Sequence, residues 1–242
     1  MRARLARYGL WQARDFVFER GFPILLIGAL LIFAVREGLN EPARAIIAAG
    51  GDDARFLGAR VMQQVLEGTW FVFALIAVHG ISGNDRSSGR FRFIFAKPVS
   101  VLRYYAQAYA IGGLLTMVCA ALVIAGTTMI APIAGTTARD ALAVYLAAWL
   151  LVGGICFFFS AIWRFDWVAT AAAVGAAGYL ASHWAGAAWL RPLPPVLPLW
   201  RQAALLKEMA PLDWRGLVWA GAYGVACFLL GLVVLRRRPL AT

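Results

Sequence analysis

Residues 84–107 read NDRSSGRFRFIFAKPVSVLRYYAQ and form the densest polar interruption in a very apolar chain. The stretch holds five basic side chains and a single acid, Asp85. Asn84 can cap a helix N-terminus, and Asp85 places negative charge in the first turn, where the helix dipole favours it. Pro98 ends a helix, because its ring lacks an N–H and disfavours helical geometry in the residue before it. The pattern predicts a helix over 85–97, roughly 20 Å long at about 1.5 Å per residue.

The predicted helix is amphipathic. Apolar side chains at i, i+3 and i+4 form one face, and basic side chains form another. The apolar face holds Phe91, Ile94 and Phe95, and the basic face holds Arg86, Arg90 and Lys97. Because hydrophobic segments flank it on both sides, we expect this helix to lie along a membrane surface. A basic, solvated loop of an unrelated membrane protein is the alternative.

Composition places the chain in a membrane. Of its 242 residues, 62% are hydrophobic and 14% are charged, whereas soluble domains have about 45–50% apolar and about 25% charged residues. The length fits about six helical spans of roughly 20 residues with short connections. The net charge of +11 is explained by basic residues at span ends, so nucleic acid is not indicated. We therefore expect an all-α integral membrane protein of one domain, residues 1–242.

The apolar runs predict six transmembrane helices. They fall at 21–35, at 61–82, within 104–138, at 141–163, at 167–190 and at 216–235. Residues 1–20 predict an amphipathic helix in the interface, with a frayed basic tail as the alternative. Between the last two spans, the proline-rich run 191–198 is expected to be non-helical, and 199–210 is expected to form a short amphipathic helix on the outer surface.

The basic residues also predict the orientation of the spans. Fourteen Arg and Lys residues fall on the side of the two termini and the second-to-third connection, and nine fall on the other side, out of 23. The positive-inside rule therefore places both termini and residues 84–100 in the cytoplasm. We expect a multi-pass protein of the plasma (inner) membrane.

The stretch at 84–107 resembles the segment between the second and third spans of ABC-2 type transporter permeases. The residues that match the family's pattern are Asp85, Arg86, Ser88, Gly89, Lys97, Pro98, Val99 and Ser100. Three positions depart from it: Ser87, Arg90 and Val101. The resemblance implies that this segment is a coupling helix, which docks on a separate ATP-binding subunit.

The resemblance also implies the wider assembly. It predicts an exporter in which two such permeases, two copies or one with a paralogue, combine with ATP-binding subunits, which bind ATP and Mg²⁺ so that this chain needs no cofactor. The residues expected to form the coupling interface are Asp85, Arg86, Gly89, Arg90, Phe91, Phe95 and Lys97. Coupling would tilt the second and fifth spans. The substrate is not predicted.

Three polar residues within the spans are candidates for a translocation path. Glu67 is expected one turn inside the outer end of the second span, where an ionisable group suggests function. The alternative is an acid that reaches the interface or pairs with Arg60 or Arg36. Thr69 lies close by, and His183 is expected near the outer end of the fifth span, where a packed, hydrogen-bonded His is the alternative. His79 is expected at the inner interface, with a water or a carbonyl as its partner.

Catalytic motifs are absent from the sequence. Neither lysine follows a glycine, so there is no P-loop, and there is no H-E-x-x-H or G-x-S-x-G. Cys119, Cys156 and Cys227 stand in separate apolar runs, so neither a disulfide nor a metal site is indicated. We expect a protein that is not itself an enzyme. A membrane anchor or assembly scaffold is the alternative function, and an ion-driven carrier is disfavoured because no span shows a charge at mid-bilayer.

Overall fold

The computed structural model describes residues 2–83, 85, 100–184 and 186–237. This part of the chain is built of helices and turns, as the sequence predicts. Five of its helices are long and apolar enough to cross a membrane. They are Tyr8–Glu37, Gly51–Val78, Val101–Thr128, Gly135–Ile162 and Trp214–Arg237. These lengths and compositions confirm the expected membrane class.

The N-terminal helix continues into the first span. It consists of α1 (Arg2–Phe16), a π-helical turn η1 (Val17–Gly21) and α2 (Phe22–Glu37). Phe16 and Gly21, at the two junctions, have right-handed helical dihedral angles. Pro23 stands in the first turn of α2, and the wider turn η1 just before it accommodates the backbone bond that proline cannot make. The sequence predicted a boundary at residue 20, where the structure instead has one unbroken helix.

The connection from α2 to the next span contains more helix than expected. α3 (Glu41–Ala49) begins at Asn40, whose side-chain oxygen accepts a hydrogen bond from the Ala43 amide at 3.0 Å. α4 (Gly51–Val78) begins well before Val61, where the sequence placed the second span. Its first turns are helical because small residues there pack closely: a Cβ at Gly58 would overlap the carbonyl of Pro132.

The central helix of the bundle is α8 (Gly135–Ile162). It packs against α4, α7 (Val101–Thr128), α9 (Asp166–His183), α10 (Val196–Lys207) and α11 (Trp214–Arg237). α8 and α11 cross at Gly154 and Gly224, where a Cβ on either residue would overlap a backbone carbonyl of the other helix. The rings of Tyr109 and Phe228 stack beside this crossing, with centroids 4.2 Å apart. The core therefore rests on a glycine contact surrounded by aromatic side chains.

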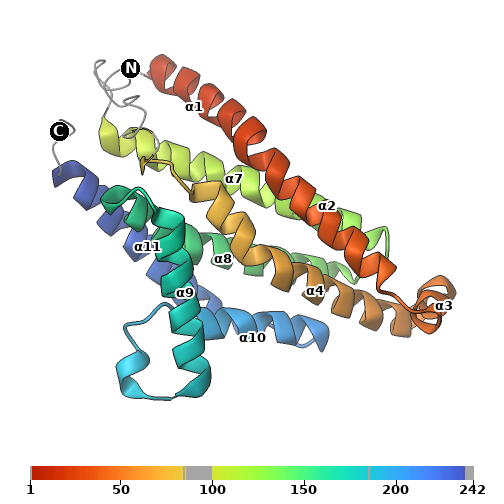
Figure 1. Ribbon diagram of the computed structural model, residues 1–242. Helices are drawn as coiled ribbons and strands as arrows, with labels where there is room; N and C mark the ends of the chain where they lie inside the picture. The colour runs from red at the N-terminus through yellow and green to blue at the C-terminus, as the bar shows by residue number, and fades with distance from the viewer. Residues whose placement is uncertain (1, 84, 86–99, 185, 238–242) are drawn as a thin grey trace.

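α9 departs from the pattern of the other long helices. It leaves the bundle at a steep angle (Figure 1) and contacts mainly α8 and α10. It ends at His183, before the predicted limit at Leu190, and it is not among the five helices that qualify as candidate spans. Its 18 residues include Asp166, Ser182 and His183. These polar residues lower its mean hydropathy.

α10 corrects one expectation. The run 191–198 was expected to be non-helical, yet its last three residues start α10. Pro198 fits there because the first-turn amides of a helix have no intrahelical partner. The helix was expected to be amphipathic, and in the structure Leu199, Gln202 and Leu206 are buried against the bundle while Trp200 is exposed. Its apolar face is therefore part of the core.

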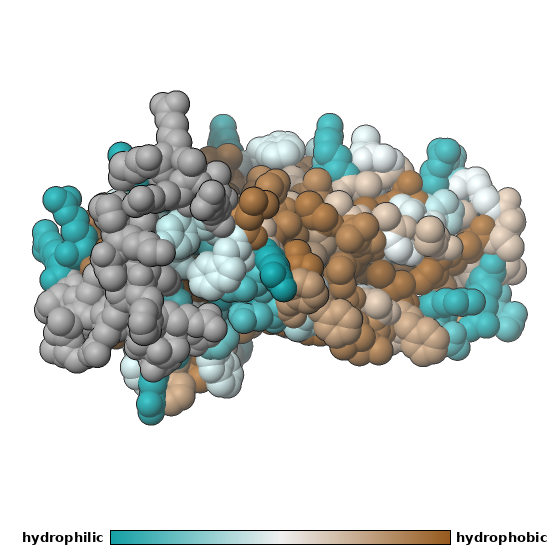
Figure 2. Space-filling model, turned by 90° about the horizontal axis from the view of Figure 1, so that it is seen from above, coloured by the Kyte–Doolittle hydropathy of each residue, from teal (hydrophilic) through white to brown (hydrophobic). Residues whose placement is uncertain are grey.

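The two ends of the bundle differ from its middle. The start of α1, the end of α4, the start of α7 and the end of α11 all lie at the end where the chain begins and stops (Figure 1). On the face shown in Figure 2, the middle of the molecule is mainly hydrophobic and hydrophilic side chains gather toward the ends. This banding is what a bundle crossing a bilayer requires.

A candidate functional site at the base of the α4–α7 connection

Of the predicted coupling residues, the structure describes one. Asp85 is 8% exposed and accepts a hydrogen bond from the Tyr105 hydroxyl on α7 at 3.4 Å. The remaining six, Arg86, Gly89, Arg90, Phe91, Phe95 and Lys97, lie outside the described residues, as does the rest of the predicted helix at 86–97. What the structure provides is the segment that leads into this stretch, residues 79–83 together with Asp85, and the elements that hold it.

The base begins with a tight turn at the end of α4. The Ile81 amide donates to the Val78 carbonyl at 3.2 Å, and Gly80 between them has φ +70°. This left-handed conformation favours glycine, because a Cβ there would crowd the following carbonyl. After this turn the chain contacts the start of α9 through Gly80 and the end of α8 through Gly83.

Asp166 connects this turn to α9. Its side chain is buried, and its two carboxylate oxygens accept three hydrogen bonds: from the Gly80 amide at 2.8 Å, from the Trp167 amide at 2.8 Å and from His79 Nδ1 at 2.6 Å. Because an ionised carboxylate only accepts, the His79 ring donates from Nδ1. Hydrogen bonds to a buried carboxylate are among the stronger ones. The end of α4 and the start of α9 are therefore joined through one side chain.

Ser160 makes the second connection, from α8. Its hydroxyl oxygen lies 3.0 Å from the Ser82 hydroxyl and accepts from the Gly83 amide at 3.0 Å and the Ser82 amide at 3.3 Å. Both serine side chains are buried. An unpaired amide at this depth would be costly, so these bonds fix the backbone just before Asp85.

Arg20 makes the third connection, from the N-terminal helix. Its Nη1 donates to the Ala77 carbonyl at 2.7 Å. This carbonyl belongs to the last turn of α4, where carbonyls lack helical partners and the dipole favours a cation. A guanidinium has four further N–H groups available to other acceptors. η1 and α4 are thus joined at the same level as the Asp166 contacts.

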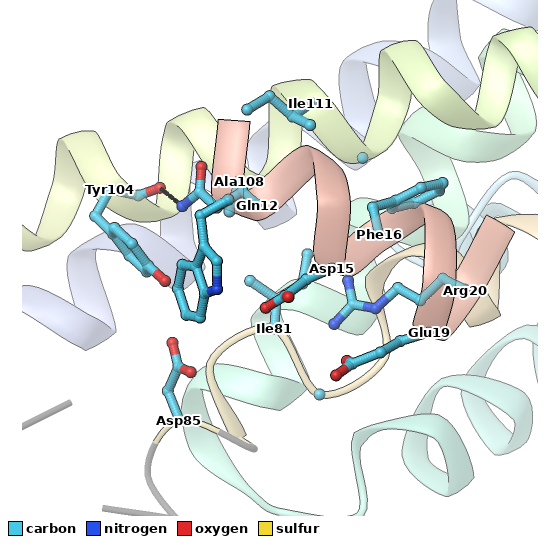
Figure 3. A pocket seen from close by; sticks show the side chains of 13 residues that line it. Gln12, Asp15, Phe16, Glu19, Arg20, Ile81, Asp85, Tyr104, Ala108 and Ile111 are labelled. Atoms are coloured by element: carbon cyan, nitrogen blue, oxygen red, sulfur yellow. Dashed lines mark hydrogen bonds between the residues drawn. The ribbon is translucent and has the colours of Figure 1, made fainter. Parts of the chain in front are cut away.

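A small polar cavity of about 80 Å³ opens beside this junction. Figure 3 shows Asp15, Glu19 and Asp85 directed toward it from opposite sides, with Arg20 among them. The Gln12 side-chain amide closes one edge by donating to the Tyr104 carbonyl at 3.4 Å. The cavity thus lies between α1, the 79–85 turn and the start of α7.

The junction, as we use the term below, comprises Arg20, His79, Gly80, Ser82, Ser160 and Asp166. No sequence pattern singled out Asp166 or Ser160 as a site residue. The sequence does contain a signal for Asp166. This acid stands in the short run 164–166 between two apolar segments, where an unpaired charge is costly, so a partner could have been expected. The partner of His79 is a carboxylate, where a water or a carbonyl was expected.

The predicted path residues do not gather at one place. Glu67 is exposed on α4 and accepts from the Gln63 side-chain amide at 2.9 Å. Gly68 beside it packs on Leu31 of α2, about one helical turn from Arg36. Glu67 therefore lies in the middle part of α4, which runs from Gly51 to Val78. Among the described residues it forms no ion pair with Arg60 or Arg36.

Thr69 and His183 have different environments. Thr69 is fully buried, donates to the Val65 carbonyl at 2.6 Å and lies 2.5 Å from the Tyr145 hydroxyl of α8. His183 is exposed at the end of α9, where its Nδ1 lies 2.9 Å from the Tyr179 carbonyl and its ring stacks on Tyr179. Thr69 thus faces the α4–α8 contact, and His183 faces outward.

Metal binding finds no support in the described residues, where no group of three or more His, Cys, Asp or Glu side chains is arranged to hold an ion. The three cysteines are unpaired, and Cys119 and Cys156 are buried. The arrangement can transmit force or hold a partner, and its polar chemistry is concentrated at the junction.

Comparison with known proteins gives no match, whether the chain is set against family models, curated proteins or solved structures.

Proposed function

We propose that this chain is the permease subunit of an ABC-2 type exporter. In this proposal the chain pairs with a second permease, either another copy or a paralogue. Separate ATP-binding subunits bind ATP and Mg²⁺ and supply the energy. The 84–100 stretch docks on those subunits, and both termini face the cytoplasm of the inner membrane. α9 completes six spans.

The observation that carries the proposal is the junction under the predicted coupling helix. The backbone at 80–83 is tied to α9 through Asp166 and to α8 through Ser160, and the end of α4 is tied to η1 by Arg20. A displacement of the 84–100 stretch would therefore reach the ends of several long helices at once. A passive loop has no need of this many buried connections. A coupling helix needs them, because its movement must be passed on to the membrane-spanning helices.

The length of α9 supports its place as a span. Eighteen residues at about 1.5 Å per residue extend roughly 27 Å, near the thickness of the hydrocarbon core. Trp167 at its first turn and Trp184 just after its end are both about half exposed. Tryptophan favours the two membrane interfaces, and in this proposal α9 crosses the bilayer with a tilt relative to the other spans, with one of these residues toward each interface.

The experiment is co-expression of the chain with its candidate ATP-binding partner, followed by purification and an ATPase assay. We expect the partner to co-purify and hydrolyse ATP. Gly89→Trp and Arg90→Glu, both in the predicted coupling helix, should release or uncouple it. Arg201→Glu, an exposed residue on α10 far along the chain, is the matched charge reversal and should leave ATPase activity unchanged.

The alternative function, a membrane anchor or scaffold without transport, makes the opposite prediction. If no ATPase associates with the chain, or if the two coupling substitutions change nothing, the 84–100 stretch acts only as a basic loop. The scaffold function would then replace the proposal.

A further inference from the structure

A second hollow adjoins the polar cavity and shares Glu19 and Arg20 with it. It is a groove of about 400 Å³ lined by Glu19, Arg20, Leu75, Ile76, His79 and Trp167. Its size falls within the range of roughly 300–1,000 Å³ that is common for small-molecule sites. The groove joins three elements that are separate in sequence: η1, the last turns of α4 and the start of α9.

The lining is divided by polarity. Leu75 and Ile76, one turn inside α4, provide an apolar floor that is only partly covered by other residues. Toward the end of α4 the lining becomes polar and aromatic, with His79 and a Trp167 side chain that is 48% exposed. Tryptophan prefers the level of lipid headgroups. The groove therefore runs from the headgroup level into the hydrocarbon region.

The polar end carries charges of both signs. Arg20 uses Nη1 for the Ala77 carbonyl and retains donors for a further acceptor. His79 donates its Nδ1 hydrogen to Asp166, so Nε2 is the ring nitrogen left for the groove. Glu19 supplies a carboxylate on the same wall. A ligand that matches this end needs an anionic group for Arg20 and a cationic donor for Glu19.

We propose that this groove binds a phospholipid with a primary-amine headgroup, of the phosphatidylethanolamine type. Its phosphate meets the Arg20 guanidinium, its ammonium meets Glu19, and the start of its acyl chains covers Leu75 and Ile76. The rest of the chains stays in the bilayer. An anionic lipid with a neutral headgroup lacks the partner for Glu19, and a choline headgroup cannot donate hydrogen bonds to it. The site is independent of the proposed transport function.

Native mass spectrometry of the full chain, released from detergent, tests the proposal. The probes are phosphatidylethanolamine, phosphatidylcholine and phosphatidylglycerol of matched acyl chains, added at equal concentration. We expect the first to bind about tenfold more tightly than the other two, since one charge-assisted hydrogen bond distinguishes them. Glu19→Gln should remove that preference, and Ile76→Trp should block binding by filling the floor.

Two controls keep the test decisive. Leu122→Trp places the same bulk on an exposed site of α7 that does not line the groove, and should leave binding unchanged. A photo-reactive amino acid at Ile76 should capture the added lipid in a reconstituted membrane. Equal binding of all three lipids by the parent chain would overturn the proposal. Capture of a second copy of the chain at Ile76 would also overturn it, since protein would then cover the groove.

Discussion

α8 and α9 follow one another along the chain, separated by three residues, yet they are held in different ways. α8 is surrounded by other helices, and it meets α11 at glycines that leave no room for a Cβ. α9 contacts mainly α8 and α10, and Gly175 at its middle has nothing within 4 Å of an added Cβ. α9 is fixed instead at its first residue, where Asp166 holds the 79–80 turn. The contrast is between a core helix enclosed by its neighbours and a helix that packs along one face and is fixed at its first residue.

The largest effect is expected where the core has least space. Gly224→Ala places a methyl group against the Leu150 carbonyl of α8, so the two helices must separate. Overpacking of this kind falls among the most damaging single changes, about 4 kcal/mol or more. We expect loss of monodisperse protein in size-exclusion chromatography and a large drop in thermal stability.

Gly175→Ala on α9 is the matched control. The same methyl group meets open space there, and alanine favours a helix by about 1 kcal/mol over glycine. We expect unchanged or slightly raised stability. If both substitutions were equally harmful, the contrast between a packed α8 and a free α9 would be wrong.

The second effect concerns the anchor of α9. Asp166→Ala leaves the Gly80 amide and His79 without their carboxylate partner. Buried hydrogen bonds to a charged group contribute about 1.5–3 kcal/mol each, and part of this is recovered by water, so we expect a loss of about 3 kcal/mol. Thermal unfolding measures the loss, and hydrogen exchange of the Gly80 amide should rise.

The exposed Asp52, which pairs with Arg55, provides the control for Asp166. Asp52→Ala should change stability by less than about 0.5 kcal/mol, as expected for a surface ion pair. A similar small effect at Asp166 would show that α9 is not anchored there.

A smaller effect is expected at Ser160. Ser160→Ala removes the acceptor of the Gly83 amide and the partner of the Ser82 hydroxyl while keeping the side-chain volume nearly constant. The expected loss is about 1–2 kcal/mol. Faster hydrogen exchange confined to the 82–83 amides would confirm that Ser160 holds the base of the connection. Unchanged exchange there would remove α8 from the junction.

The contrast between these regions also explains what the sequence could reveal. Long apolar runs predicted six spans, and five helices of the described residues qualify, because a membrane helix needs only hydrophobicity and length. The early start of α4 was missed, because Gly58 takes its place from tertiary neighbours rather than from local pattern. The bond between Asp166 and Gly80 was missed for the same reason. These residues are far apart in sequence, and no periodicity links them.

The smallest expected effect concerns Thr69, a predicted path residue that faces Tyr145. Thr69→Val and Tyr145→Phe each remove one hydroxyl of a buried pair with little change in shape. Each should cost about 1 kcal/mol, and the double variant should cost less than the sum, because the bond between the two hydroxyls is lost only once. A double-mutant cycle of thermal stabilities measures this coupling. If Thr69 instead lined a path, Thr69→Val would alter transport, and its loss of stability would add to that of Tyr145→Phe. Coupling therefore assigns Thr69 to the rigid α4–α8 contact, and additivity with changed transport assigns it to the path.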